Sequence, residues 1–215
     1  MPLYIHKNIQ PEGELGLWKI AESEIFFWQK MQFTEEEEEQ ISQIKGGGRR
    51  LEWLSVRYLL HIMSGREKRG TVLKDEMGKP YLENSKYQIS ISHSNGIAAA
   101  IASPNLVGID IQKIVSKIGR IAHKYMRDVE MDSLHPITRI PHLHVYWGAK
   151  EALYKAYGRK KLDFKDHILI EPFDLDFSDG KCKGKVLKGD YEKDFDVFYE
   201  LYENYVLVYA QEIKK

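Results

Sequence analysis

The stretch YQISISHSNGIAAAIA, residues 87–102, predicts a β-hairpin. Apolar and polar residues alternate from Tyr87 to Ser94, as they do along a strand with one buried face. Asn95-Gly96 is the dipeptide that two-residue hairpin turns favour, and Ile97–Ala102 supplies the returning strand. The middle of the chain is therefore β-rich, and the other elements are placed on either side of this hairpin.

Helical and strand-like segments flank the hairpin on both sides. Thr34 and Glu37 form a capping-box pattern that predicts a helix start, and apolar residues recur at helical spacing from Arg49 to Met63. Before the hairpin we also expect a helix over Ser23–Met31 and strands over Leu3–Ile9, Glu14–Ile20, Thr71–Lys74 and Tyr81–Glu83. After it we expect a strand over Leu106–Gln112, helices over Ile114–Val129 and His144–Tyr157 separated by Pro136 and Pro141, and strands over Ile168–Phe177, Lys181–Leu187, Asp194–Tyr202 and Tyr205–Glu212.

A helix followed by an antiparallel sheet thus occurs twice, once on each side of about residue 105. The predicted fold class is α+β, with two pseudo-symmetric halves, residues 1–105 and 106–215, each a helix plus antiparallel sheet. Clefts between such halves are common ligand sites, so we expect the active site at their interface.

Composition narrows the choice of partner and compartment. The chain has 215 residues, 43% of them hydrophobic, and its 32 Lys and Arg balance its 32 Asp and Glu. A net charge of zero gives no global attraction to nucleic acid or to an anionic membrane. Cys182 is the only cysteine, and the sequence shows neither a signal peptide nor the ~18–20 apolar residues of a membrane span. These features predict a cytoplasmic protein that binds neither nucleic acid nor membrane.

One candidate for chemistry is LVGIDIQ, residues 106–112. Alternate side chains of a strand share a face, so Asp110 and Gln112 point the same way as Gly108. A carboxylate then lies beside an amide oxygen, and the glycine leaves room for a ligand. An ordinary strand with a polar outer face is the alternative interpretation.

The second candidate is WGAKEALYK, residues 147–155. On a helix, Trp147, Glu151, Tyr154 and Lys155 fall within one stripe. Glu151 and Lys155 alone would be a common surface ion pair, but a tryptophan on the same stripe indicates a face that is at least partly covered. The third candidate is QISISHS, residues 88–94, which ends a strand with hydroxyl and imidazole donors.

Taken in order, these segments resemble a known family. GKP at 78–80, ISHS at 91–94, VGID at 107–110 and WGAKEALYK at 147–155 resemble the 4′-phosphopantetheinyl transferases, in particular the longer, monomeric type that activates surfactin synthetase. RLEWLSVR at 50–57 is similar to the arginine-bearing helix that precedes Gly-Lys-Pro in that family. The resemblance spans residues 49–155, and four motifs in the right order are far more specific than any one of them.

The resemblance implies a reaction and a catalytic set. The family transfers 4′-phosphopantetheine from coenzyme A to a serine of an apo acyl or peptidyl carrier protein and releases adenosine 3′,5′-bisphosphate. Asp110 and Glu151 match its metal carboxylates, which would hold Mg²⁺, with Mn²⁺ as an alternative. Glu151 would also act as the base for the serine hydroxyl, Lys155 would lie against the attacked phosphate, and Lys150 would help to neutralise phosphate charge.

The resemblance also implies contacts with coenzyme A. Ser92, His93 and Lys79, with the backbone of Gly78 and Pro80, correspond to such contacts. Either Arg50 or Arg57 would pair with the 3′-phosphate, because a guanidinium fork suits a phosphate. The surrounding segment, Lys45–Arg69, has seven Lys or Arg against two Glu, a net charge of +5.

One position departs from the family pattern, and one segment is expected to meet the partner. Relatives often carry a second carboxylate where this chain has Gln112, whose amide oxygen can ligate Mg²⁺ directly or through a water. Ile114–Met131, which carries five Lys or Arg when Lys113 is included, is the expected docking segment for an acidic carrier protein, or else a plain amphipathic helix. The family type also implies a monomer.

Three alternative interpretations remain open at this point. The chain could be a relative that binds coenzyme A or carrier proteins without catalysis, although intact Asp110, Glu151 and Lys155 argue against this. A metal-dependent phosphodiesterase would use water in place of a protein serine. A zinc site at His142 and His144, with His135 nearby, is disfavoured because no thiolate or further ligand accompanies these histidines.

Overall fold

Two antiparallel sheets form the centre of the fold in a computed structural model that describes residues 3–214. The first sheet has the strand order β1-β2-β6-β5-β4-β3, and the second has the order β7-β11-β10-β9-β8. The strands of the first sheet are β1 (Leu3–Asn8), β2 (Glu14–Lys19), β3 (Val72–Lys74), β4 (Pro80–Leu82), β5 (Gln88–Ser94) and β6 (Ile97–Ser103). Those of the second are β7 (Val107–Lys113), β8 (Ile168–Ile170), β9 (Asp179–Lys188), β10 (Tyr191–Tyr202) and β11 (Tyr205–Glu212).

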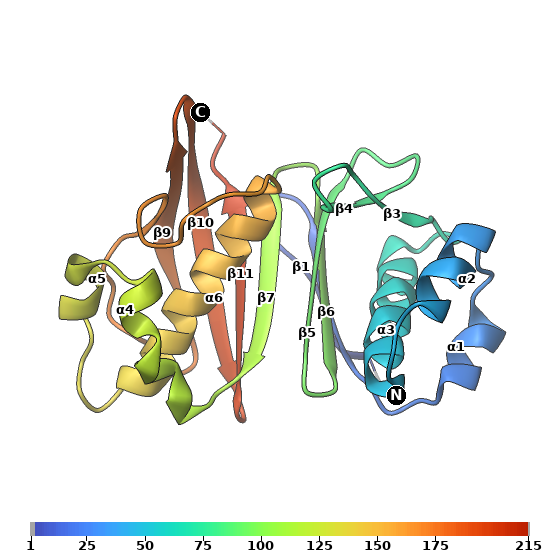
Figure 1. Ribbon diagram of the computed structural model, residues 1–215, viewed down its shortest axis with the longest axis horizontal. Helices are drawn as coiled ribbons and strands as arrows, with labels where there is room; N and C mark the ends of the chain where they lie inside the picture. Colours follow the sequence, from blue (N-terminus) through green and yellow to red (C-terminus); the bar gives the residue numbers. More distant parts are fainter. Residues whose placement is uncertain (1–2, 215) are drawn as a thin grey trace.

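Helices cover the outer face of each sheet. The helices before the hairpin are α1 (Glu24–Lys30), α2 (Glu35–Ser42) and α3 (Gly47–Ser64). After it come a 3₁₀ turn, η1 (Ser116–Arg120), and then α4 (Ala122–Tyr125), α5 (Asp128–Asp132) and α6 (Arg139–Tyr157). Figure 1 shows α3 beside the first sheet with α1 and α2 outside it, and α6 beside the second sheet with α4 and α5 outside it. The predicted α+β class is therefore confirmed.

Apolar side chains fill three layers against the sheets, and a smaller cluster joins α1, α2 and α3. One layer lies between the two sheets, where Leu17 and Ile101 of the first sheet belong to the same buried cluster as Ile109 and Leu207 of the second. A second cluster joins α3 to the first sheet, and a third, the largest, joins α6 to the second sheet. Each sheet is thus buried on both faces.

Strand β7 follows the predicted alternation. Val107, Ile109 and Ile111 belong to the cluster between the sheets, whereas Gly108 faces α6. A Cβ atom on Gly108 would lie 1.8 Å from the carbonyl oxygen of Ala152, so only glycine lets α6 lie against the strand at this point. This close approach brings the residues of α6 near the polar side chains of β7.

Serine side chains join the two sheets at their adjoining strands, β5 and β7 (Figure 1). Ser90, Ser92 and Ser94 of β5 lie two residues apart and therefore share one face of the strand. Their hydroxyl oxygens accept hydrogen bonds from the backbone N–H groups of Ile109, Ile111 and Lys113 at 3.1, 3.2 and 3.2 Å. This serine ladder fixes the register of one half against the other.

Three predicted elements differ from the structure. The helix expected over Ile114–Val129 is broken into η1, α4 and α5, because Met126 and Arg127 are extended and the Arg127 N–H is capped by the Glu130 side chain at 2.8 Å. Helix α6 begins at Arg139 and so includes Pro141, which is tolerated because first-turn N–H groups have no partner within the helix.

The strand expected over Ile168–Phe177 ends at Ile170, shortly before Pro172, which has no N–H for a ladder. The remaining predicted helices and strands are found within a few residues of their expected bounds. Among the described residues, no helix is long and apolar enough to cross a membrane.

Candidate active site

Three donors surround the carboxylate of Asp110 on β7. Lys155 Nζ on α6 lies 2.8 Å from Asp110 Oδ1, and the hydroxyl of Ser92 donates to the same oxygen at 2.9 Å. The amide nitrogen of Gln112 donates to the other oxygen, Oδ2, at 3.2 Å. Lys155 also donates to Ser92 Oγ at 3.1 Å and to the carbonyl oxygen of Ile109 at 2.9 Å. Both sheets and α6 therefore contribute to one polar cluster.

Glu151 adds a second carboxylate one turn before Lys155. Burial raises the pKa of Glu151, the charge of Asp110 raises it further, and the charge of Lys155 opposes both. In the described part of the chain, no group of three or more His, Cys, Asp or Glu could hold a metal ion. A cation bound here would therefore be held by the two carboxylates, and other ligands would complete its coordination.

Gln112 turns its nitrogen, not its oxygen, toward Asp110. Its Oε1 lies 2.8 Å from His144 Nδ1, and its Nε2 donates to the carbonyl oxygen of His144 at 3.1 Å. The amide oxygen that the sequence offers as a metal ligand is thus bound to His144 in this structure.

A basic pocket of about 270 Å³ lies where the Gly-Lys-Pro turn of the first half meets the end of α6. Lys79 Nζ crosses to α6 and donates to the carbonyl oxygen of Ala156 at 2.9 Å, and burial lowers the pKa of Lys79. Gly158, at φ +68°, has no space for a side chain because a Cβ atom would lie 2.3 Å from Lys79 Cδ. The residues lining the pocket include Lys74, Gly78, Lys79, Pro80, Tyr154, Lys155, Arg159 and Lys160.

A larger pocket of about 720 Å³ lies against α3 on the first half. Its cationic lining residues are Lys45, Arg49, Arg57 and Lys74, with His93 and Glu52 at 3.1 Å from each other. The Arg57 guanidinium lies 3.3 Å from the centroid of the Trp53 ring. Burial lowers the pKa of Arg57 to about 9, which leaves it cationic at neutral pH, and its Nε atom makes no hydrogen bond but lies 3.7 Å from the buried carboxylate of Glu37.

Arg50 lies outside both of these pockets. Its Nε atom is 2.9 Å from the Glu24 carboxylate on α1, and its Nη1 donates to the carbonyl oxygen of Ile44 at 3.4 Å. Of the two arginines that the sequence left open, the structure therefore favours Arg57 as a pocket residue. Arg49, which the sequence did not single out, lines the same pocket.

Lys150 lies in the core and not beside the polar cluster. Its ammonium is fully buried and donates to the carbonyl oxygens of Phe164 and Ile168 at 2.9 and 2.8 Å. It also lies 2.8 Å from the buried carboxylate of Glu130. All three donors of the ammonium are thus used inside the protein, which corrects the predicted phosphate contact of Lys150.

The histidines considered for zinc do not converge. The His142 ring stacks on Tyr146, and neither of its buried nitrogens has a partner. The His144 ring is bound to Gln112, whereas His135 is exposed and accepts from the backbone N–H of Ile137 at 3.3 Å. Each histidine therefore has separate surroundings.

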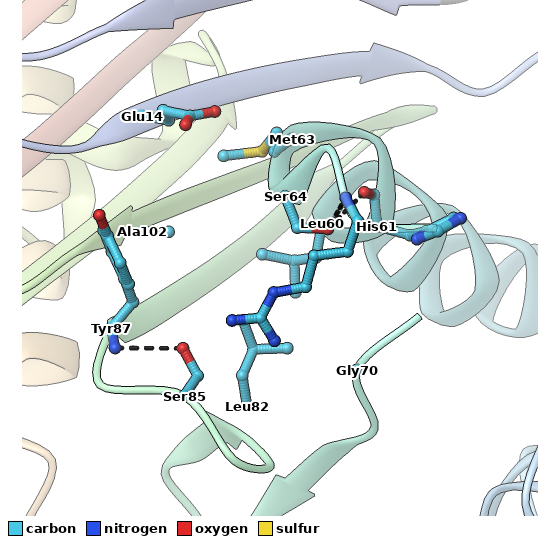
Figure 2. A pocket seen from close by; sticks show the side chains of 11 residues that line it. Glu14, Leu60, His61, Met63, Ser64, Gly70, Leu82, Ser85, Tyr87 and Ala102 are labelled. Atoms are coloured by element: carbon cyan, nitrogen blue, oxygen red, sulfur yellow. Dashed lines mark hydrogen bonds between the residues drawn. The ribbon is translucent and has the colours of Figure 1, made fainter. Parts of the chain in front are cut away.

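Figure 2 shows a further pocket, of about 150 Å³, near the C-terminal end of α3. Glu14 and Tyr87 lie on one side of it, and Leu60, His61 and Met63 come from the helix. None of the predicted site residues lines this pocket, so it is separate from the polar cluster.

The part of the chain that carries Asp110, Gln112, Glu151 and Lys155 is similar to a known family. Residues 106–210 match the family model of the 4′-phosphopantetheinyl transferase superfamily. The match covers just under half of the chain, from the residue before β7 to within β11, and it supports transfer of phosphopantetheine as the general activity. No curated protein matches the chain.

Sequence reasoning missed Arg49 and the contact of His144 with Gln112, and only the first of these has a signal in the sequence. Arg49 precedes Trp53 by four residues and Arg57 by eight, so all three share one face of α3. His144 precedes Gly148 by four residues on α6, and a Cβ atom on Gly148 would lie 3.1 Å from Gln112 Nε2. This close approach is seen only in the structure, so the sequence did not identify His144 as the partner of Gln112.

Proposed function

We propose that this protein transfers the 4′-phosphopantetheine group from coenzyme A to a serine of an apo acyl or peptidyl carrier protein and releases adenosine 3′,5′-bisphosphate. The observation that carries the proposal is the polar cluster of Asp110, Glu151, Lys155 and Ser92, which lies where β5, β7 and α6 meet, beside two cationic pockets. Residues 1–105 would take the 3′-phosphate and adenine side of coenzyme A. Residues 106–215 would carry the metal and catalytic residues.

The cations suit a ligand with several phosphates. Lys155 and Lys79 line the pocket at the interface, together with Arg159 and Lys160. Arg57 and Arg49 line the larger pocket on α3, where His93 also lies. Coenzyme A carries a pyrophosphate and a separate 3′-phosphate, so two adjoining cationic pockets match its charge distribution.

The reaction needs a base and a cation at the attacked phosphorus. The carrier serine must lose its proton as its oxygen attacks the β-phosphate, and adenosine 3′,5′-bisphosphate leaves with the electron pair of the broken P–O bond. Glu151 is suited to accept that proton, because burial and Asp110 raise its pKa. Lys155 is suited to offset the charge that develops on the phosphoryl oxygens.

The two carboxylates fit a divalent cation. Asp110 and Glu151 lie close enough for the charge of one to raise the pKa of the other. Mg²⁺ takes oxygen ligands and keeps waters and substrate phosphates in its remaining positions, so two protein carboxylates are enough, and Mn²⁺ accepts similar ligands. When bound, the ion would neutralise pyrophosphate charge.

The carrier is proposed to dock on the segment Ile114–Met131. Five exposed cations lie along or next to it, and two apolar side chains, Ile121 and Val129, are 37% and 50% exposed among them. The cations are Lys113, Lys117, Arg120, Lys124 and Arg127. Basic residues around apolar ones complement a partner helix that is acidic and amphipathic.

A mixing experiment tests the proposal. Purified protein, coenzyme A and MgCl₂ are incubated with several apo carrier proteins, and the carriers are analysed by intact mass spectrometry. A gain of about 340 Da on a carrier, absent when its serine is replaced by alanine, is the expected result.

The other outcomes separate the rival functions. Binding of coenzyme A with no gain in carrier mass, over all carriers and metals tried, would identify a non-catalytic binding protein. Release of free phosphopantetheine without any carrier would identify a phosphodiesterase.

A further inference from the structure

His144 is a buried polar residue of α6 whose ring bridges β7 and the segment after it. Its side chain is 1% exposed. Nδ1 lies 2.8 Å from Oε1 of Gln112, and Nε2 lies 2.9 Å from the backbone nitrogen of Val115. Both ring nitrogens therefore have close partners, in contrast to those of His142 on the same helix.

The partners fix where the ring proton lies. His144 Nε2 lies 2.9 Å from the Val115 nitrogen, which can only donate, and 3.1 Å from the Val115 carbonyl oxygen, which can only accept, so Val115 is compatible with either tautomer. Gln112 decides between them, because its amide nitrogen faces two acceptors and its oxygen is left facing His144 Nδ1. In a neutral ring the proton is then on Nδ1, which donates to Gln112 Oε1. Burial favours this neutral form because it lowers the pKa of His144.

The amide of Gln112 is oriented independently of Val115. Its oxygen faces His144 Nδ1 because its nitrogen is held on the other side. That nitrogen meets two acceptors, Asp110 Oδ2 at 3.2 Å and the carbonyl oxygen of His144 at 3.1 Å. In the reverse orientation, Gln112 would set its oxygen against both of these oxygens, which is unfavourable.

We propose that His144 is a positioning residue for Asp110, because it holds the side-chain amide of Gln112 as a hydrogen-bond donor to the Asp110 carboxylate. Gln112 then donates a hydrogen bond to the metal carboxylate and is not itself a ligand. Together with Ser92 and Lys155, it gives Asp110 three donors and thus one fixed orientation. The inference rests on the proposed function only in treating Asp110 as a metal carboxylate.

Two substitutions of His144 separate its two hydrogen bonds. His144→Gln keeps an acceptor near the Nε2 position for Val115 but has no donor near the Nδ1 position. His144→Asn keeps a donor near the Nδ1 position for Gln112 but loses the bond to Val115. The two variants are matched in polarity, and each loses one neutral hydrogen bond.

The test is a double-mutant cycle with Gln112→Ala in the full-length protein. Transfer rate and Mn²⁺ affinity are measured, the latter by electron paramagnetic resonance with coenzyme A and without carrier. His144→Gln should weaken both about three- to tenfold, as loss of one neutral hydrogen bond does, and His144→Asn should lie closer to the wild type. In the Gln112→Ala background, His144→Gln should have no further effect, because the residue through which it acts is gone.

A spectroscopic measurement tests the proton position without turnover. The ¹⁵N spectrum of histidine-labelled protein, assigned by comparison with the His144 variants, should show His144 protonated at Nδ1 and not at Nε2. A neutral His144 that donated to the Val115 carbonyl oxygen instead would be protonated at Nε2 and could not donate to Gln112.

Two results would overturn the inference alone: a His144 ring protonated at Nε2, or an equal loss from His144→Gln with and without Gln112. Failure of the wild type both to transfer phosphopantetheine and to bind Mn²⁺ with coenzyme A would overturn the proposed function, and this inference with it.

Discussion

Two lysines of the same helix, Lys150 and Lys155, differ completely in their surroundings. Lys155 reaches a polar cluster that opens onto a pocket, and Lys150 is enclosed with the carboxylate of Glu130. We expect Lys155→Met to lower kcat on the order of 10²–10³-fold, as loss of a contact to developing charge does. We expect Lys150→Met to lower the free energy of unfolding by about 3–5 kcal/mol, because Glu130 is left charged and buried without its cation.

Steady-state kinetics and urea unfolding of both variants check this prediction. Each variant serves as the control for the other, since the substitution is the same and the helix is the same. A large loss of stability in Lys155→Met together with normal stability in Lys150→Met would contradict it. A raised KM with normal kcat in Lys155→Met would assign Lys155 to ground-state binding.

The second prediction at this scale concerns Glu151. Its carboxylate is proposed both to accept the serine proton and to hold the cation, and the charges of Asp110 and Lys155 act on it. Glu151→Gln should therefore remove turnover by at least about 10²-fold while the melting temperature stays within a few degrees of the wild type. Turnover near that of the wild type would exclude Glu151 from the site.

At the residue scale, the candidate residues lie together in the structure where motif order fixes the element. Ser92, Asp110, Gln112 and Lys155 meet because each motif lies at a defined place on β5, β7 or α6. The assignment of an arginine on α3 was ambiguous. Which side chain faces the pocket depends on the distant partner Glu24, which takes Arg50, and no local pattern shows that contact.

Among the secondary-structure elements, the contact between α6 and β7 depends on Gly108. Because a Cβ atom there would lie 1.8 Å from the carbonyl oxygen of Ala152, backbone must move to admit it. Gly108→Ala should lower the free energy of unfolding by at least about 3 kcal/mol and should reduce turnover, since Asp110 and Lys155 meet across this contact.

Gly48→Ala is the matched control for Gly108→Ala. A Cβ atom on Gly48, in the first turn of α3, would meet nothing within 4 Å. Its unfolding free energy should be unchanged or higher by up to about 1 kcal/mol, because alanine favours helix over glycine. Equal effects of the two substitutions in urea unfolding would contradict the role given to Gly108.

Element prediction from the sequence was reliable for periodic segments and weak at their ends. The hairpin around Asn95-Gly96 and the helix α3 were found because a turn dipeptide and a long apolar stripe are local signals. The helix expected over Ile114–Val129 kept its periodic apolar residues but not its continuity. Its break depends on the side chain of Glu130, which also binds Lys150 and the backbone of Ile170, and tertiary contacts of this kind have no local signature.

At the scale of the whole molecule, a buried histidine makes stability depend on pH. Burial lowers the pKa of His142 to about 4, from a usual value near 6.5, so the unfolded chain binds its proton first as pH falls. Above pH 6.5 this histidine is neutral in both the folded and the unfolded chain, so it does not make stability depend on pH there. Stability is lost as pH falls from about 6.5 toward 4. The full loss is about 3 kcal/mol.

His142→Phe should remove the part of this dependence that comes from His142, while His144, whose pKa burial also lowers, keeps its own part. Phenylalanine keeps the ring contacts with Tyr146 and Phe173 and removes two buried nitrogens that lack partners. Urea unfolding at pH 7.5 and pH 5 should show a smaller difference for this variant than for the wild type. The control is replacement of the exposed His123 by alanine, which should leave the difference between the two pH values as in the wild type. An unchanged difference in His142→Phe would contradict the assignment of the pH dependence to His142.

The two halves share enough structure that we expect them to unfold together. The apolar cluster between the sheets takes Leu17 and Ile101 from one half and Ile109 and Leu207 from the other. The serine ladder and the bond from Lys79 to α6 add polar links across the same interface. Unfolding either half would expose the apolar face of the other, which disfavours a half-folded state.

The distribution of the four tryptophans allows this to be tested. Trp147 is in the second half, and the other three, Trp18, Trp28 and Trp53, are in the first. Fluorescence of a Trp147→Phe variant reports the first half alone, and fluorescence of a variant with the other three replaced by phenylalanine reports the second. In each variant the fluorescence transition in urea should coincide with the transition in far-UV circular dichroism, which reports both halves. Both probes are read on the same variant, so any stability lost through the substitution affects both equally. Separate midpoints for the two probes would show that the halves unfold independently. The register set by the serine ladder could then not be what holds Asp110 and Ser92 together.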